Sequence, residues 1–338
     1  YWGCRKYSKV LQVTEVVLSC IKFKSKFQTV KNNKTSKVTQ MTQKIDLILT
    51  PPTLEEDLII QHTNVLVTLD REPYTGELPI KDYGINQKFI ESLKTVVPAP
   101  RANTYVLNVV SLEVTDGKVT LHTNYSNMRS LFALRRWIPE LSEDSPERAL
   151  ILQNVLPIGG EMMLESIDGK ILIEERGKVE VSGKYNPAPA GGCETRNWKV
   201  FPEPFRSIKG EAWEETGLLP GDYSPVGLIG VARDFTDGYN PTFVYHAVVK
   251  LPLAEIIAKA DSIAPEAGEH QRLFGVETTA SKLLDFCTEN VQKIVGNGLG
   301  GIIVFGGYKF GDSWVQEAIQ ELERHDWEIN DYGKRFPK

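Results

Sequence analysis

The sequence predicts an α/β protein, with an α/β/α sandwich around a mixed sheet preceded by a smaller α+β domain. The chain has 338 residues, which is enough for two hydrophobic cores. From about residue 159 onward, strand-like and helix-like segments alternate. Earlier in the chain, strand-like segments and turns predominate. We therefore predict a basic leader at residues 1–44, an N-terminal α+β domain at 45–145 and a second domain at 146–338.

The leader differs in charge from the rest of the chain. Residues 1–44 carry ten Lys or Arg residues and one acid, Glu15, whereas the whole chain has a net charge of -5. The acidic remainder is a poor general binder of nucleic acid, so we do not expect a nucleic-acid partner. Two interpretations of the leader stay open. It is either a transit peptide or sequence upstream of a natural start at Met41.

Two further features bear on location. No apolar run approaches the roughly 20 residues of a membrane-spanning helix, so we expect no membrane association. The four cysteines have neither the density of a disulfide scaffold nor the paired spacing of a zinc site. They are Cys4, Cys20, Cys193 and Cys287. These observations favour a reducing, cytoplasmic location, with a mitochondrial location as the alternative if the leader is genuine.

The N-terminal region shows a simple pattern of strands and turns. Its strand-like segments cover residues 65–69, 105–112 and 118–122. A Thr-Asp-Gly-Lys turn joins the last two of them, and residues 86–95 have a helical pattern. Residues 142–147 are acidic and contain Pro146, so we place the linker between the domains there.

The second domain opens with a hairpin. Two strand-like segments, 159–164 and 171–176, flank an Asp-Gly turn. A segment rich in Gly and Pro follows at 187–192. Further strand-like segments lie at 226–232, 242–249 and 272–276, and helix-like segments at 253–260 and 282–295.

A helix is predicted between the Gly/Pro-rich segment and the later strands. Pro204 suits its first turn, and Gly217 followed by Pro220 supplies a left-handed end. Its apolar stripe is expected to be buried. The stripe consists of Phe205, Ile208 and Ala212.

The same helix carries three closely spaced carboxylates. Glu211, Glu214 and Glu215 stand at i, i+3 and i+4, which we expect to form an acidic face distinct from the apolar stripe. No Lys or Arg lies three or four residues from any of them, so their repulsion has no local compensation. The pattern therefore predicts a divalent-metal site. The alternative is a solvated acidic helix end.

The hairpin, the Gly/Pro-rich segment and the acidic helix together resemble the Nudix hydrolases. The motif of that family is G-x5-E-x7-R-E-U-x-E-E-x-G-U, where U is aliphatic, and residues 211–218 match its second half. Gly210 stands where the family has Arg. Glu203 lies one residue too close to serve as the first Glu of the motif, and Gly192 lies four residues too far away. Over roughly residues 101–310, the chain resembles an atypical subfamily that includes animal UDP-glucose diphosphatase.

This resemblance implies an enzyme that hydrolyses a diphosphate linkage in a nucleoside diphosphate derivative, with Mg²⁺ or Mn²⁺ as cofactor. A UDP-sugar, split into UMP and a sugar phosphate, is the expected substrate. The implied partner is therefore a small nucleotide derivative, and a homodimer is left open. Two alternatives remain. One is an inactive Nudix-fold scaffold in a mitochondrial assembly, and the other is an RNA 5′-end pyrophosphohydrolase.

The resemblance also implies roles for the acidic residues. Glu211, Glu214 and Glu215 would be metal ligands, and Glu215 or Glu269 the catalytic base. Glu266 is an alternative to Glu269, whereas Glu277 is disfavoured because it lies at the far end of the adjoining strand.

Substrate contacts are expected from a second group of residues. Arg176 and Arg233 are the candidate phosphate contacts. Gly191 and Gly192 would let the backbone approach metal or substrate closely. The five histidines are too dispersed for a zinc motif. His270 is interpreted as a loop residue, and a contact with the substrate is the alternative.

Overall fold

The computed structural model describes residues 43–66, 104–115, 118–127, 141–142, 145, 158–177, 182–195, 203–234, 240–264 and 270–331. Two sheets and five helices lie within these ranges. The predicted helix at 86–95 lies outside the described residues, as do Cys4, Cys20, Met41, Glu266 and Glu269. Most of the leader does too.

The larger sheet has nine strands in the order β12-β6-β5-β11-β10-β1-β13, with β7 paired to β6 and β8 paired to β5. The strands are β1 (Gln43–Leu54), β5 (Gly159–Ser166), β6 (Lys170–Arg176), β7 (Tyr185–Pro187), β8 (Ala190–Gly192), β10 (Gly227–Asp234), β11 (Pro241–Val249), β12 (His270–Glu277) and β13 (Trp327–Asp331). The β5–β11 and β1–β13 pairs are parallel and the other described pairs are antiparallel. The predicted mixed sheet is confirmed.

A smaller sheet packs beside it, in the order β2-β4-β3-β9. Its strands are β2 (Ile59–Leu66), β3 (Tyr105–Thr115), β4 (Lys118–Asn127) and β9 (Glu194–Thr195). A short 3-10 helix, Glu55–Asp57, joins β1 to β2. The predicted strands at 105–112 and 118–122 are confirmed, and that at 65–69 lies only partly within the described residues.

The division into domains stays a prediction, but two pairings cross the predicted boundary. Strand β1 belongs to the larger sheet, where it lies between β10 and β13. Strand β9, which comes after β8 in the chain, pairs instead with β3 of the smaller sheet.

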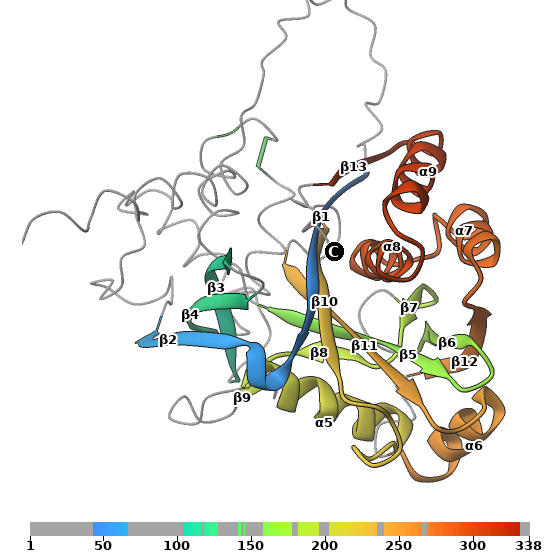
Figure 1. Cartoon of the computed structure of the whole chain (residues 1–338), viewed down its shortest axis with the longest axis horizontal. Helices are drawn as coiled ribbons and strands as arrows, with labels where there is room; N and C mark the ends of the chain where they lie inside the picture. The colour runs from blue at the N-terminus through green and yellow to red at the C-terminus, as the bar shows by residue number, and fades with distance from the viewer. Residues whose placement is uncertain are drawn as a thin grey trace, which may run out of the picture.

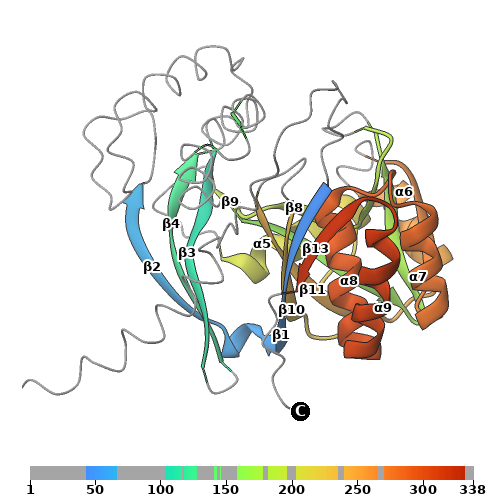
Figure 2. The same cartoon turned by 90° about the horizontal axis from the view of Figure 1, so that it is seen from above.

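Helices cover both faces of the larger sheet, which confirms the predicted sandwich (Figure 1). They are α5 (Pro204–Thr216), α6 (Leu253–Ile263), α7 (Ala280–Glu289), α8 (Gly296–Phe310) and α9 (Asp312–Glu323). Figure 2 shows the layers in sequence: the smaller sheet, α5, the larger sheet, and then α8 and α9. Among the described residues, no helix has the length and apolar character needed to span a bilayer.

The predicted helix at 282–295 is wrong in its extent. Helix α7 ends at Glu289, and α8 begins at Gly296 after a turn. Helix α8 has six glycines among its 15 residues, which removes the usual helical signal from the sequence.

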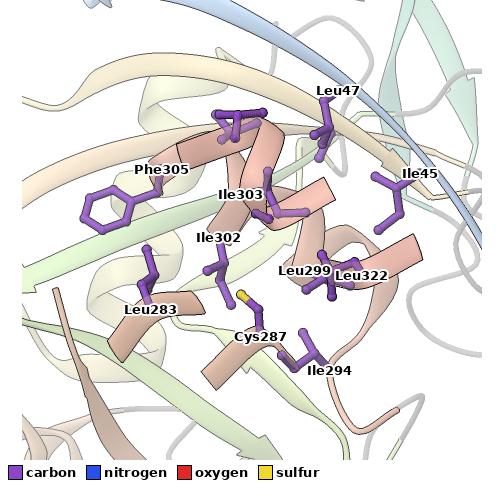
Figure 3. Close-up of a cluster of buried hydrophobic side chains, with 14 of the residues drawn as sticks. Ile45, Leu47, Leu283, Cys287, Ile294, Leu299, Ile302, Ile303, Phe305 and Leu322 are labelled. Atoms are coloured by element: carbon purple, nitrogen blue, oxygen red, sulfur yellow. The ribbon is translucent and has the colours of Figure 1, made fainter. Parts of the chain in front are cut away.

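One hydrophobic core surrounds α8. Leu299, Ile302 and Ile303 of α8 pack with Ile45 and Leu47 of β1, and the neighbouring residues are drawn in Figure 3. A second core fills the space between α5 and the two sheets, and it joins Leu107 and Leu121 of the smaller sheet to Phe205 of α5. These two cores hold the larger sheet between its helical layers.

Candidate functional site

Helix α5 has well-defined ends. The carboxylate of Glu203 caps its first turn by accepting the backbone N–H groups of Phe205 at 3.0 Å and Arg206 at 2.6 Å. At the other end Gly217 adopts a φ of 68°, and its N–H bonds to the Trp213 carbonyl. The predicted start at Pro204 and end at Gly217 are confirmed.

The burial of α5 matches the predicted apolar stripe but adds one acid to it. Phe205, Ile208 and Ala212 are buried, as predicted. Glu215 is also buried, with 4% of its surface exposed. The predicted separation of acidic and apolar faces is therefore wrong for Glu215, because position 215 lies one helical turn beyond Ala212 on the same face.

Glu215 faces the Gly/Pro-rich segment. Its two carboxylate oxygens lie 3.4 and 3.3 Å from the backbone N–H of Ala190, at the start of β8. Burial raises the pKa of the Glu215 carboxyl well above its usual range, and the charges of Glu174 and Glu211 raise it further. The ionised form of Glu215 is therefore disfavoured in this environment.

Glu211 lies against β8 one turn earlier. A Cβ atom added to Gly191 would be 2.1 Å from a Glu211 carboxylate oxygen, so any other residue at this position would require the Glu211 carboxylate to move. Gly192 stands instead beside the Glu194 side chain. The Glu211 side chain helps to line a small crevice between α5, β5 and β8. Other residues that line it include Gly159, Gly160, Cys193, Ser207 and Tyr245.

A third carboxylate reaches the same region from β6. One oxygen of Glu174 lies 2.6 Å from His270 Nδ1, and the other lies 3.4 Å from the Arg176 guanidinium. The other ring nitrogen of His270, Nε2, lies 3.2 Å from the backbone carbonyl oxygen of Glu215. Glu174, Glu215 and His270 each offer a ligand atom, and these atoms lie within 4.8 Å of one another.

Sequence reasoning missed Glu174 and misjudged His270. Glu174 follows three buried apolar residues on a strand that is covered on both faces, so alternation does not reveal where its side chain points. His270 is the first residue of β12, where it pairs with Arg176, and not a loop residue. The signal that joins them is the pairing of β6 with β12, which a single sequence does not display.

The remaining predicted residues fall at different distances from this group. Arg176 contacts Glu174 and lies beside the site. Arg233 lies on β10, separated from β8 by β5 and β11, or roughly 14 Å at the usual strand spacing. Glu214 is half-buried on α5. Glu277 pairs with Lys170 at the far end of β12 and is exposed.

The two described cysteines, Cys193 and Cys287, are buried and not disulfide-bonded. Burial raises the pKa of each thiol to about 12, which keeps the thiols protonated at neutral pH.

The donor set fits a divalent cation. Carboxylates from α5 and β6 converge in a place where burial makes uncompensated negative charge costly. Carboxylate oxygens are the ligands that Mg²⁺ and Mn²⁺ favour. The residues present therefore fit such an ion on the chemistry of the donors and on their burial.

No protein-family profile matches the sequence, and no curated protein sequence does. Solved structures do match, among them a crystal structure of a Nudix hydrolase from M. smegmatis, RenU. The identity is 13%, the match covers 45% of this chain and 83% of that chain, and the TM-score is 0.29. A likeness at this TM-score carries no argument, so the function proposed below rests on the site itself and on the motif.

Proposed function

We propose that this protein is a divalent-metal-dependent hydrolase of diphosphate linkages. The observation that carries the proposal is the burial of Glu215 beside Glu174 and Glu211, with a pKa raised by burial and by both neighbouring charges. Ionisation of Glu215 in the folded protein costs stability, and a bound cation would offset that cost. The helical motif that matches the second half of the Nudix signature adds support.

Each residue has a proposed role. Glu211, Glu214 and Glu215 would hold Mg²⁺ or Mn²⁺. When bound, the ion would neutralise phosphate charge and promote ionisation of a water molecule. The Gly191 backbone allows the Glu211 carboxylate to lie against β8. Glu215 or Glu269 is the proposed base, and Glu269 lies outside the described residues.

Arg176 is the better placed of the two proposed phosphate contacts. Its guanidinium lies beside Glu174 at the edge of the carboxylate group, and a planar guanidinium can bind two phosphate oxygens at once. Arg233 remains a weaker proposal because two strands lie between β10 and β8.

The substrate class within this activity is a finer proposal. A UDP-sugar, giving UMP and a sugar phosphate, is favoured by the similarity of the motif to that of the UDP-sugar diphosphatases. The cytoplasmic location and the homodimer remain expectations from the sequence.

The test compares the wild type with Glu215→Gln on a panel of UDP-glucose and other nucleoside diphosphate derivatives, with Mg²⁺ or Mn²⁺ present. We expect turnover to fall by a factor on the order of 10² to 10⁴, the range typical for loss of a catalytic proton-transfer group. Glu161→Gln is the matched control. Glu161 is also a fully buried glutamate with a raised pKa, but its side chain lies under α8 on the opposite face of the sheet.

A stability measurement separates loss of chemistry from loss of metal. Saturating Mn²⁺ should raise the melting temperature of the wild type. At a Mn²⁺ concentration 100 times the dissociation constant, the free energy of unfolding should rise by about 2.7 kcal/mol. The rise should be much smaller for Glu215→Gln. Folded, metal-bound protein that leaves the whole panel untouched would end the proposal and favour the scaffold alternative.

A further inference from the structure

Three buried donor atoms of two chemical kinds converge between α5, β6 and β12. Glu174 and Glu215 each contribute a carboxylate oxygen and His270 contributes a ring nitrogen, all within 4.8 Å of one another. The side chains of Glu174 and His270 are each 4% exposed, and Glu215 as a residue is 4% exposed. The imidazole distinguishes this group from the all-carboxylate set of Glu211, Glu214 and Glu215.

The orientation of His270 is that of a metal-binding histidine. Its Nε2 lies 3.2 Å from the Glu215 carbonyl oxygen, which can only accept a hydrogen bond, so Nε2 carries the proton. In the neutral imidazole the lone pair then lies on Nδ1, which points at Glu174 from 2.6 Å. Histidines that bind metals commonly donate their other ring N–H to a backbone carbonyl in this manner.

The same geometry gives an electrostatic reason for a cation. The ligand atoms of Glu174 and Glu215 lie within 4.8 Å of each other, and the Arg176 guanidinium contacts Glu174 at 3.4 Å. Two carboxylates and a lone pair that face one another out of water repel strongly. A divalent ion among them would replace this repulsion with three ligand bonds.

The spacing suits one ion after small side-chain movements. Ligand atoms about 2.1 Å from a shared ion lie roughly 3 to 4 Å apart, which falls between the shortest and longest separations allowed in this group. The residues come from a helix and two paired strands, so the backbone holds them in place.

We propose that Glu174, Glu215 and His270 form a mixed nitrogen–oxygen site that prefers a first-row transition ion, such as Mn²⁺ or Co²⁺, to Mg²⁺. Imidazole favours transition ions, whereas Mg²⁺ favours oxygen ligands and retained water. Glu215 is shared with the carboxylate set of the proposed function. Binding at the mixed site does not require that the protein hydrolyse anything.

The competing interpretation is a buried ion pair in which His270 is protonated and bonds to Glu174. It predicts no bond between a metal and the ring nitrogen. The two interpretations therefore differ in a directly measurable property.

The test is pulsed electron paramagnetic resonance of Mn²⁺ added to the full chain without substrate. We expect nitrogen modulation from one imidazole in the wild type. In His270→Gln the modulation should disappear, and Mn²⁺ affinity at this site should fall about tenfold or more, while Mg²⁺ affinity changes less. His246→Gln is the matched control. His246 is also largely buried and pairs with a glutamate, Glu165, but it lies at another place on the sheet.

Every outcome decides the question. Modulation that is absent from Mn²⁺-bound wild type, or that persists in His270→Gln, overturns the proposal. If His270→Gln fails to fold, the wild-type spectrum and Glu174→Gln, which should weaken Mn²⁺ binding but keep the nitrogen signal, decide instead. Failure of the proposed hydrolysis would appear as no turnover of the substrate panel, and it would leave the nitrogen signal unchanged.

Discussion

Helices α5 and α8 cover opposite faces of the same sheet, yet the sequence specifies them in different ways. Helix α5 has a capping carboxylate, a proline in its first turn and a left-handed glycine at its end. Helix α8 has no side-chain cap at Val295, and ten of its 15 residues are buried, five of them glycines. Helix α5 is thus encoded locally, whereas α8 depends on the surfaces that surround it.

The difference shows where each helix can accept change. The glycines of α8 let the helix approach the strands until their side chains nearly touch its backbone. A Cβ at Gly300 would be 2.6 Å from the Ala232 Cβ. On α5, Glu215 shares the buried face with Phe205, Ile208 and Ala212, so the contact surface includes an acid that the proposed chemistry needs. Packing restricts α8, and charge restricts α5.

The largest expected stability effect is on α8. Gly300→Ala would place a methyl group against Ala232 and Ile45, both held in strands, and should cost about 3 kcal/mol, at the upper end of the usual penalty for overpacking. Urea unfolding monitored by circular dichroism measures it. An unchanged free energy of unfolding would mean that α8 packs less tightly against β10 than this 2.6 Å approach indicates.

A substitution of Glu161, which lies beneath α8, should stabilise the protein, whereas Gly300→Ala should destabilise it. Among the residues that the structure describes, its Oε1 atom has no hydrogen-bond partner, and burial raises the pKa of its carboxyl well above the usual range. Glu161→Met should therefore stabilise the protein by about 2 kcal/mol at neutral pH. Because the folded pKa is raised, the wild type should lose stability relative to Glu161→Met as the pH rises above about 4.5. A constant difference across that range would contradict the raised pKa.

The capping of α5 gives a smaller effect. Glu203→Ala removes the acceptor for the Phe205 and Arg206 N–H groups and should cost about 1 kcal/mol. Glu203→Gln, which keeps one acceptor oxygen, should cost less. Mn²⁺ affinity should be unchanged in both variants by calorimetry, because this carboxylate caps the helix. A clear loss of affinity would mean that Glu203 also contributes to the metal site.

The smallest effect completes the comparison of the two helices. A Cβ at Gly210 would meet nothing within 4 Å among the described residues. Gly210→Ala should therefore stabilise α5 by about 0.5 to 1 kcal/mol, the usual gain at a helical glycine with open space around it. The same substitution thus has opposite signs on the two helices. If thermal unfolding shows that both substitutions stabilise or both destabilise the protein, the two helices do not differ in the way that their packing indicates.

The sequence predicts what is encoded over short distances. The hairpin around the Asp-Gly turn and the extent of α5 follow from neighbouring residues and match the structure. The start of α8 does not, because glycine weakens the helical pattern and burial supplies the stability instead. The pairing of β1 with β10 and β13 could not be predicted from the sequence either, since it joins segments far apart in the chain.

The candidate site divides in the same way. Glu211, Glu214 and Glu215 were accessible because their spacing lies on one helix. Glu174 and His270 join them through the order of strands in the sheet, which a single sequence does not reveal. Burial of Glu215 also depends on tertiary structure. Its position next to Ala212 on the helical face was the one local clue.

The position of β1 has a consequence for synthesis on the ribosome. Strand β13, among the last residues described, pairs with β1, and β1 also supplies Ile45 and Leu47 to the core around α8. The emerging polypeptide can pair β1 with β10 earlier, but the other edge of β1 must stay open until residues 327–331 have left the exit tunnel. Nascent chains arrested before residue 327 should expose that edge, which makes it a natural place for a chaperone to bind.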